Sequence, residues 1–189
     1  TEFMNYSPLV YAYNKTNVAV TGKGTLNGQA SNKNWWRWIN KEIYGWKKGE
    51  PSYADPLNRD RLVEMGEQNI PVAERIFGEG HYLRPNFVEF FECKNVLVKD
   101  ITIVNAPFWI IHPIKSENVI VDGVNINSHG PNNDGCDPEY SKNVIIKNCI
   151  FNTGDDCIAI KAGRDGDGRR VAMKSENIVV QNCTMYDGH

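Results

Sequence analysis

Residues 118–126 read NVIVDGVNI, and near copies of this phrase recur along the chain. NVLVKDITI begins at Asn95, NVIIKNCIF at Asn143 and NIVVQNCTM at Asn177, and a more divergent copy, NVAVTGKGTL, begins at Asn17. Within each copy apolar residues alternate with polar ones, a pattern that is typical of β-strands and not of helices. The repeat therefore predicts a fold built from short strands.

The spacing of the repeat indicates how these strands are arranged. Asn95, Asn118, Asn143 and Asn177 lie 23, 25 and 34 residues apart, and the segment GRDGDGRRVAMKSE accounts for the longest gap as an insertion. A period in the low twenties is typical of a solenoid with stacked coils, and the leucine signature of leucine-rich repeats is missing. We therefore predict an all-β fold, a right-handed single-stranded parallel β-helix that forms one domain over residues 1–189.

Stacked coils place equivalent residues above one another, which predicts ladders. The repeated asparagines are expected to form one at a turn, because asparagine tolerates tight-turn geometry. Cys149 and Cys183 each follow their asparagine by six residues, so we expect them to stack in the interior. An odd count of cysteines without C-x-x-C spacing argues against a zinc site and a full disulfide framework. All five are therefore expected to be free thiols: Cys93, Cys136, Cys149, Cys157 and Cys183.

Residues 29–92, called the excursion below, interrupt the repeat. This segment is rich in Trp, Lys and Asn, and a short helix is expected around RLVEM at residues 61–65. Its aromatic residues are expected to form a small satellite core, and a platform that stacks against sugars is the alternative. At 189 residues the whole chain is long enough for one domain but hardly for two.

The bulk properties exclude some classes of function. The formal charge of −2 and the pI near 6.1 give no basic stripe of the kind that nucleic acids require. No run of about 18 apolar residues is present, so no membrane span is expected. The first residues, TEFMNYSPLV, lack the features of a signal peptide.

Four aspartates stand beside the predicted strands: Asp134, Asp137, Asp155 and Asp156. Asp134 and Asp156 are 22 residues apart, about one coil, so they are expected to be neighbours on one face of the solenoid. Asp155 and His189 each lie twelve residues past their repeat asparagine, which places them on neighbouring coils as well. Three aspartates and a histidine are therefore expected to converge.

The cluster favours chemistry over structure. Any one of these aspartates alone is better explained by a turn. Three stacked carboxylates repel one another and raise the pKa of at least one, which a fold does not need and acid–base catalysis does. Calcium binding is the main chemical alternative, and the nearby His189 and Lys161 argue against it, because cationic groups are poor neighbours for a hard cation. We therefore expect neither a metal nor another cofactor.

With these residues placed, the chain resembles glycoside hydrolase family 28, the polygalacturonases. The family's Asn-Thr-Asp, Gly-Asp-Asp and Gly-His-Gly motifs are similar, in order and in one-coil spacing, to Asn132-Asn133-Asp134, Gly154-Asp155-Asp156 and Gly188-His189. The segments SHGPNNDGCDP and CIAIKAGRDGDGRR look most like the bacterial branch that removes sugars from chain ends. The family's downstream Arg-x-Lys motif has no counterpart, so we expect a fragment of a longer enzyme, truncated at its C-terminus.

The resemblance implies an inverting hydrolase that cleaves α-1,4-galacturonosyl bonds of polygalacturonate, the backbone of pectin, from chain ends. Asp155 would be the general acid that protonates the leaving oxygen, and Asp134 and Asp156 would hold and activate the water. His189 would orient the acid. Because hydrolysis of a glycosidic bond needs one protonated and one charged carboxyl group, the three aspartates suit this reaction.

The polyanionic substrate implies a cleft with cationic side chains. The residues expected to bind it are Asn132, Lys161, Arg164 and His112, whereas Arg169 and Arg170 fit a cleft role and an exposed structural role equally well. The expected partner is acidic plant cell-wall polysaccharide, with no nucleic acid or membrane, and the expected protein is a secreted or periplasmic monomer. Three alternatives stay open: a rhamnogalacturonan or xylogalacturonan hydrolase, a β-helical protein that binds acidic polysaccharide, and a polysaccharide lyase.

Overall fold

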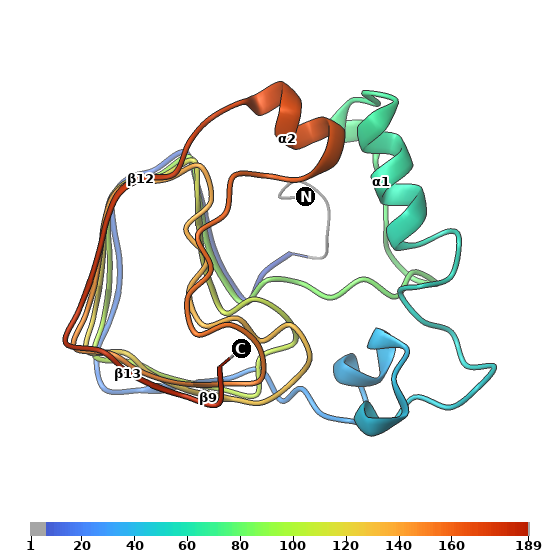
Figure 1. Ribbon diagram of the computed structural model, residues 1–189, viewed down its shortest axis with the longest axis horizontal. Helices are drawn as coiled ribbons and strands as arrows, with labels where there is room; N and C mark the ends of the chain where they lie inside the picture. Colours follow the sequence, from blue (N-terminus) through green and yellow to red (C-terminus); the bar gives the residue numbers. More distant parts are fainter. Residues whose placement is uncertain (1–6, 189) are drawn as a thin grey trace.

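The computed structural model describes residues 7–188 and shows a right-handed parallel β-helix, as predicted (Figure 1). Its coils share three parallel sheets. The first contains β1 (Val10–Tyr13), β4 (Val88–Phe91) and β7 (Ile111–Ile114). The second contains β2 (Thr16–Thr21), β5 (Lys94–Lys99), β8 (Glu117–Asp122), β10 (Lys142–Lys147) and β12 (Glu176–Gln181). The third contains β3 (Thr25–Asn27), β6 (Thr102–Val104), β9 (Asn125–Ser128), β11 (Ile150–Thr153) and β13 (Thr184–Tyr186).

The alternation of apolar residues explains the interior of the solenoid. In the second sheet Val96, Val119 and Val144 stand in register on β5, β8 and β10, and all three are buried. In the third sheet Ile126 and Phe151 are paired in the same way and are fully buried. Each coil thus adds one layer of apolar side chains to a continuous core, which is the main source of stability in a solenoid.

The repeated asparagines form the predicted ladder along the second sheet. The side-chain amide of each asparagine donates to the side-chain oxygen of the one before it, at 2.8 Å from Asn95 to Asn17, 3.0 Å from Asn118 and from Asn143, and 3.1 Å from Asn177. All five have φ between 56° and 60°. This left-handed conformation is accessible to asparagine at low cost, which explains why the repeat begins with this residue.

The five cysteines are free thiols, as predicted. Cys149 is buried, and Cys183 follows it one coil later and packs partly exposed against the same core. The backbone N–H of Thr184 donates to the Cys149 carbonyl at 2.9 Å, which fixes the two cysteines in register.

The excursion leaves the solenoid after β3 and contains three 3-10 turns and one helix. These are η1 (Trp35–Ile39), η2 (Glu42–Tyr44), α1 (Arg59–Glu67) and η3 (Val72–Glu74). The helix confirms the prediction made from RLVEM. The chain returns as β4 at Val88, so the predicted end of the excursion at residue 92 was too late: β4 already pairs with β1 and β7.

The aromatic side chains of the excursion pack on one another and on the solenoid. Trp35 meets Trp38 edge-on at 4.7 Å, and Trp38 meets Tyr82 at 5.4 Å. The indole N–H of Trp36 donates to the Ala106 carbonyl at 2.9 Å. These contacts favour a satellite core over a platform for sugars.

The insertion before β12 forms α2 (Asp165–Val171), which packs against α1 (Figure 1). Arg75 of the excursion makes a two-pronged ion pair with Asp167, at 2.6 and 2.9 Å, and both side chains are almost fully buried. Arg169 pairs with Glu67, and Arg170 donates to the Gly66 carbonyl. Arg169 and Arg170 therefore have structural roles that join the two segments.

Within residues 7–188, no helix has the length and apolar character needed to cross a bilayer.

Candidate active site

The three predicted aspartates lie where the chain passes from the third sheet to the first. Cys136 bridges Ile111 on one side and Ile158 on the other, which places Asp134 and Asp156 at equivalent positions of neighbouring coils. One carboxylate oxygen from each of Asp134, Asp155 and Asp156 lies within 4.8 Å of the others. The predicted convergence of the three aspartates is therefore present, and their catalytic roles stay a prediction.

Two glycines of the predicted motifs are required by close packing beside this cluster. A Cβ on Gly154 would lie 2.5 Å from the Gly130 carbonyl oxygen, and a Cβ on Gly188 would lie 2.5 Å from the Cys157 sulfur. Any side chain at these positions would push neighbouring coils apart. His189 lies outside the described residues, so its predicted place beside Asp155 stays a prediction.

Asp134 is almost fully buried and is paired with Lys161. The Lys161 ammonium lies 3.0 Å from Asp134 Oδ2, 3.1 Å from Asp137 Oδ1 and 4.1 Å from the centre of the Trp109 ring. Burial raises the pKa of Asp134, and the Lys161 charge acts in the opposite direction. Lys161 was predicted to bind substrate; the structure also gives it two carboxylate partners inside the protein.

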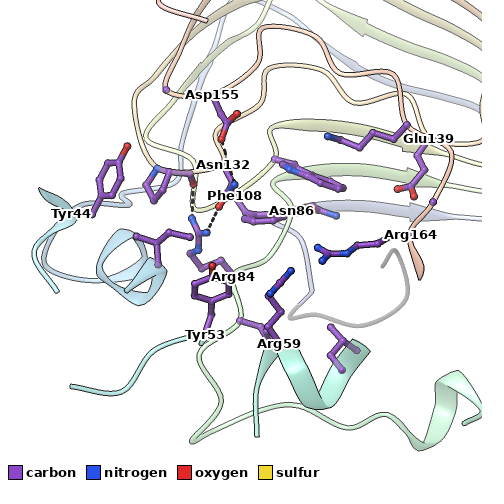
Figure 2. Close-up of a pocket in the computed structure, with 18 of the residues that line it drawn as sticks. Tyr44, Tyr53, Arg59, Arg84, Asn86, Phe108, Asn132, Glu139, Asp155 and Arg164 are labelled. Atoms are coloured by element: carbon purple, nitrogen blue, oxygen red, sulfur yellow. Dashed lines mark hydrogen bonds between the residues drawn. The ribbon is translucent and has the colours of Figure 1, made fainter. Parts of the chain in front are cut away.

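A second contact chain leads from the excursion to Asp155, and Figure 2 shows Asn132 between Arg84 and Asp155. Arg84 donates to the Asn132 side-chain oxygen at 2.7 Å, and the Asn132 amide donates to Asp155 Oδ2 at 3.4 Å. Arginine is a donor only, so the oxygen of the Asn132 amide faces Arg84 and its nitrogen faces Asp155. Burial lowers the pKa of Arg84 to about 10, which leaves it charged at neutral pH.

Arg84 and Asp137 were not predicted as functional residues. Arg84 lies in the excursion, outside the repeat, so no register argument could place it. Its guanidinium also donates to the carbonyls of Pro107 and Pro131, which fastens the loops of two successive coils.

Asp155 of this cluster lines a cavity of about 820 Å³, within the range of ligand pockets, whereas Asp134 and Asp156 are not among its lining residues. One wall comes from the coils and includes Phe108, Trp109, Asn132 and Asp155. The other walls come from the excursion and from the start of the insertion. Five cationic side chains line the cavity: Lys41, Arg59, Arg84, Lys161 and Arg164. Asn132, Lys161 and Arg164 line this cavity, and their substrate-binding roles stay a prediction; Figure 2 labels Asn132 and Arg164.

His112 does not line this cavity, and its predicted contact with a sugar is wrong. The side chain is fully buried, with Nδ1 2.9 Å from Glu89 Oε2 and Nε2 2.8 Å from Glu139 Oε2. Burial opposes the charge on the imidazole, but the hydrogen bonds to Glu139 and Glu89 outweigh it and raise the pKa of His112 to about 9. His112 is therefore the charged centre of a buried carboxylate–imidazolium ladder.

The three aspartates are close enough together to attract a divalent cation. The Lys161 ammonium, however, already supplies a positive charge at 3.0 Å from Asp134. Acid–base chemistry therefore stays the prediction for this cluster.

The comparison with protein families agrees with this geometry. The model of glycosyl hydrolases family 28 matches residues 78–189, which include the predicted catalytic residues. The chain belongs to this family.

Comparisons with individual proteins point to the same family. The crystal structure of a hyperthermoactive exopolygalacturonase from Thermotoga maritima is 51% identical and superposes with a TM-score of 0.93, over 97% of this chain and 41% of that one. The chain is 25% identical to the exo-poly-α-D-galacturonosidase of Dickeya chrysanthemi, over 92% of this chain and 29% of the relative. It is 27% identical to a probable polygalacturonase of Vitis vinifera, over 95% and 29%. The chain thus spans well under half the length of these relatives.

Proposed function

We propose that the chain carries the catalytic aspartates of an inverting hydrolase that removes galacturonate from the ends of polygalacturonate. The observation that carries this proposal is the cavity of about 820 Å³ with Asp155 in its wall and five cationic side chains around it. A polyanionic sugar chain needs such cations, because arginine and lysine bind carboxylates through charge-assisted hydrogen bonds. The exopolygalacturonase of T. maritima supports the choice of substrate and of exo action.

In the proposed reaction Asp155 gives its proton to the glycosidic oxygen as the bond to the anomeric carbon breaks. Asp134 and Asp156 hold a water, take its proton, and direct its oxygen to the same carbon. The carboxylate oxygens lie within 4.8 Å of one another, closer than the roughly 6.5 to 9.5 Å that separates carboxyl groups in most inverting enzymes. Inversion is therefore proposed from the family resemblance and not from this distance.

The shape of the cavity supports exo action. The excursion and α2 are joined by the buried Arg75–Asp167 pair, and the cavity is lined by residues of the excursion and by Gly163 and Arg164, which directly precede α2. Walls of this kind suit the terminal sugar of a chain better than a long internal stretch. Since the proposed substrate is a cell-wall polymer, we also propose that the protein is a monomer that works outside the cytoplasm.

The test is product analysis with the gene product that contains this sequence, incubated with polygalacturonate. We expect monomeric galacturonate from the first time points, new reducing ends, and no absorbance from an unsaturated bond. Proton NMR of the fresh product should show the inverted anomer. Unsaturated products would indicate a lyase, early oligomers would overturn exo action, and binding without any cleavage would indicate a polysaccharide-binding protein.

A further inference from the structure

Asp137 is a buried acid for which the proposed reaction has no use. Its side chain is fully buried, and within residues 7–188 the cation at ion-pair distance is Lys161, at 3.1 Å. Burial first, and then the neighbouring Asp134, raise the pKa of Asp137 well above its usual range. Burying a carboxyl group with so few partners lowers the stability of the fold. The function of Asp137 therefore has to be inferred from the group that it contacts.

What Asp137 holds is the ammonium of Lys161. The ammonium is fixed from three sides, by Asp137, by Asp134 at 3.0 Å, and by the face of Trp109 at 4.1 Å. The Trp109 ring is itself held edge-on against the buried His112 ring, at 5.2 Å. An ammonium has three donors, and these contacts engage it before any substrate arrives.

Asp134 needs such a cation. In the proposed reaction it must be charged in order to take a proton from water, yet burial and the nearby Asp155 both raise its pKa. Lys161 acts against both effects. The charged and titratable groups that face Asp134 come from its own loop, the next coil and the excursion: Asp137, Asp155, Asp156, Lys161 and Arg84. Among them Lys161 is the cation in direct contact.

We propose that Lys161 is a positioning residue for Asp134: Asp137 and Trp109 hold its ammonium against the Asp134 carboxylate, which stays charged and fixed in place. Asp137 Oδ1 lies 3.1 Å from the same ammonium and limits its movement away from Asp134. This inference rests on the proposed hydrolysis, and it replaces the expectation that Lys161 mainly binds the sugar.

The test compares Lys161→Met with Arg164→Met in the gene product that contains this sequence. Both residues are cations that line the same cavity, but Arg164 is half exposed and pairs with Asp165 at 2.8 Å, whereas Lys161 pairs with Asp134 at 3.0 Å. For Lys161→Met we expect the acid limb of the profile of kcat/KM against pH to move upward by about one pH unit or more, because Asp134 then loses its proton at higher pH. Its KM should change less than threefold. Arg164→Met should raise KM and leave the limb in place.

Variants at Asp137 test the anchor. Asp137→Leu should move the acid limb in the same direction as Lys161→Met, and Asp137→Asn, which keeps a carbonyl oxygen for the ammonium, should move it less. Circular dichroism and thermal unfolding identify any variant that does not fold. If the Asp137 variants do not fold, Lys161→Met, at a partly exposed site, tests the inference on its own. Equal shifts for Leu and Asn at position 137 would overturn the anchoring role.

A direct titration separates this inference from the proposed function. Carbon-13 NMR of the Asp134 carboxyl group should show a higher midpoint in Lys161→Met than in the parent, whatever the substrate is. A parent that releases no sugar would refute the proposed function, and the titration would still decide the role of Lys161. An unmoved midpoint, or a raised KM with an unmoved acid limb, would overturn the inference and make Lys161 a substrate ligand.

Discussion

The coils of the solenoid and the excursion differ in how they are held together. In the coils, five strands of the second sheet stand in register, and one continuous apolar core runs beneath them. The excursion has one helix of nine residues, and its separate apolar cluster consists of Leu62 and Leu83 with Phe77 packed against them. The first region is rigid because each coil braces the next, whereas the second depends on a few contacts with its neighbours.

We expect this difference to divide two roles, with catalytic groups on the coils and substrate-binding groups on the excursion. The carboxylates, which must be fixed closely, sit on loops between strands of the solenoid. The excursion supplies Lys41, Arg59 and Arg84 to the cavity and is fastened by the Arg75–Asp167 pair and by Arg84. We therefore expect changes in the coils to act on turnover and global stability, and changes in the excursion to act on affinity and local stability.

The largest effect is expected for Asp155→Asn, in the coils. General acid catalysis is worth roughly 10² to 10⁴ in rate, so kcat on polygalacturonate should fall by about this factor. The amide has the same size, so the unfolding midpoint should stay within about 1 °C of the parent.

Asp122→Asn is the matched control, since Asp122 lies on the outer surface of the same solenoid and accepts from Asn148 at 2.7 Å. It should keep parental turnover. Parental turnover in Asp155→Asn as well would remove Asp155 from the role of acid.

A pair of core substitutions compares the two regions in stability. Phe151→Ala removes a fully buried ring from the solenoid core and should cost about 3 to 5 kcal/mol of unfolding free energy. Leu62→Ala removes a side chain from the small cluster of the excursion and should cost about 2 kcal/mol, at the low end for such a change.

Hydrogen exchange shows where each loss falls. For Leu62→Ala, faster exchange should stay within the excursion, while β10 and β11 keep their protection. If both substitutions speed exchange through all coils equally, the two regions form one cooperative unit and the contrast drawn above is wrong.

The sequence predicted the coils because their residues obey a rule that repeats. Asn95, Asn118 and Asn143 each mark the same left-handed turn. The spacing of 22 residues between Asp134 and Asp156 is about one coil, and the bridge between Cys136 and Ile158 agrees with it. The excursion obeys no repeated rule, so its helix could be predicted but not the positions of Arg84 and Arg59. The contact between Lys161 and Asp137 could not be predicted from the sequence either, because it depends on side-chain directions that strand register does not fix.

The wrong prediction for His112 has a physical reason. A strand residue on the outer face of a solenoid is normally exposed, and this one is covered because the excursion brings Asn86 onto it, at 2.9 Å from Nδ1. Tertiary contacts of an unrepeated segment thus overrode the pattern of the coils.

The His112 ladder predicts how stability depends on pH. In the unfolded chain the histidine pKa is about 6.5, and in the fold it is raised to about 9. The stabilisation is therefore fully present below about pH 6.5 and is lost as pH rises through about 9, by roughly 3 kcal/mol in total. Urea unfolding between pH 6 and 10 measures this loss.

His112→Gln is the comparison for that titration, because glutamine is close in size and does not titrate. Its unfolding free energy should be lower than that of the parent at pH 6 and should vary less between pH 6 and 10. Parallel curves for the two proteins would show that His112 is neutral in the fold.

The smallest effect is expected for Arg59→Met in the excursion. Arg59 begins α1, lines the cavity and is about two-fifths exposed, and its guanidinium lies 3.6 Å from Asp60, a weak surface pair that a substrate carboxylate can replace. A charge-assisted hydrogen bond in such a setting is worth about 1.5 kcal/mol, so KM should rise about tenfold with kcat within a factor of two. Arg61→Met is the control on the same helix, because Arg61 pairs with Glu64 at 2.9 Å and does not line the cavity. A rise in KM for both variants would point to a general loss of positive charge. A fall in kcat for Arg59→Met alone would mean that the excursion takes part in catalysis. The proposed division of roles between the two regions would then be wrong.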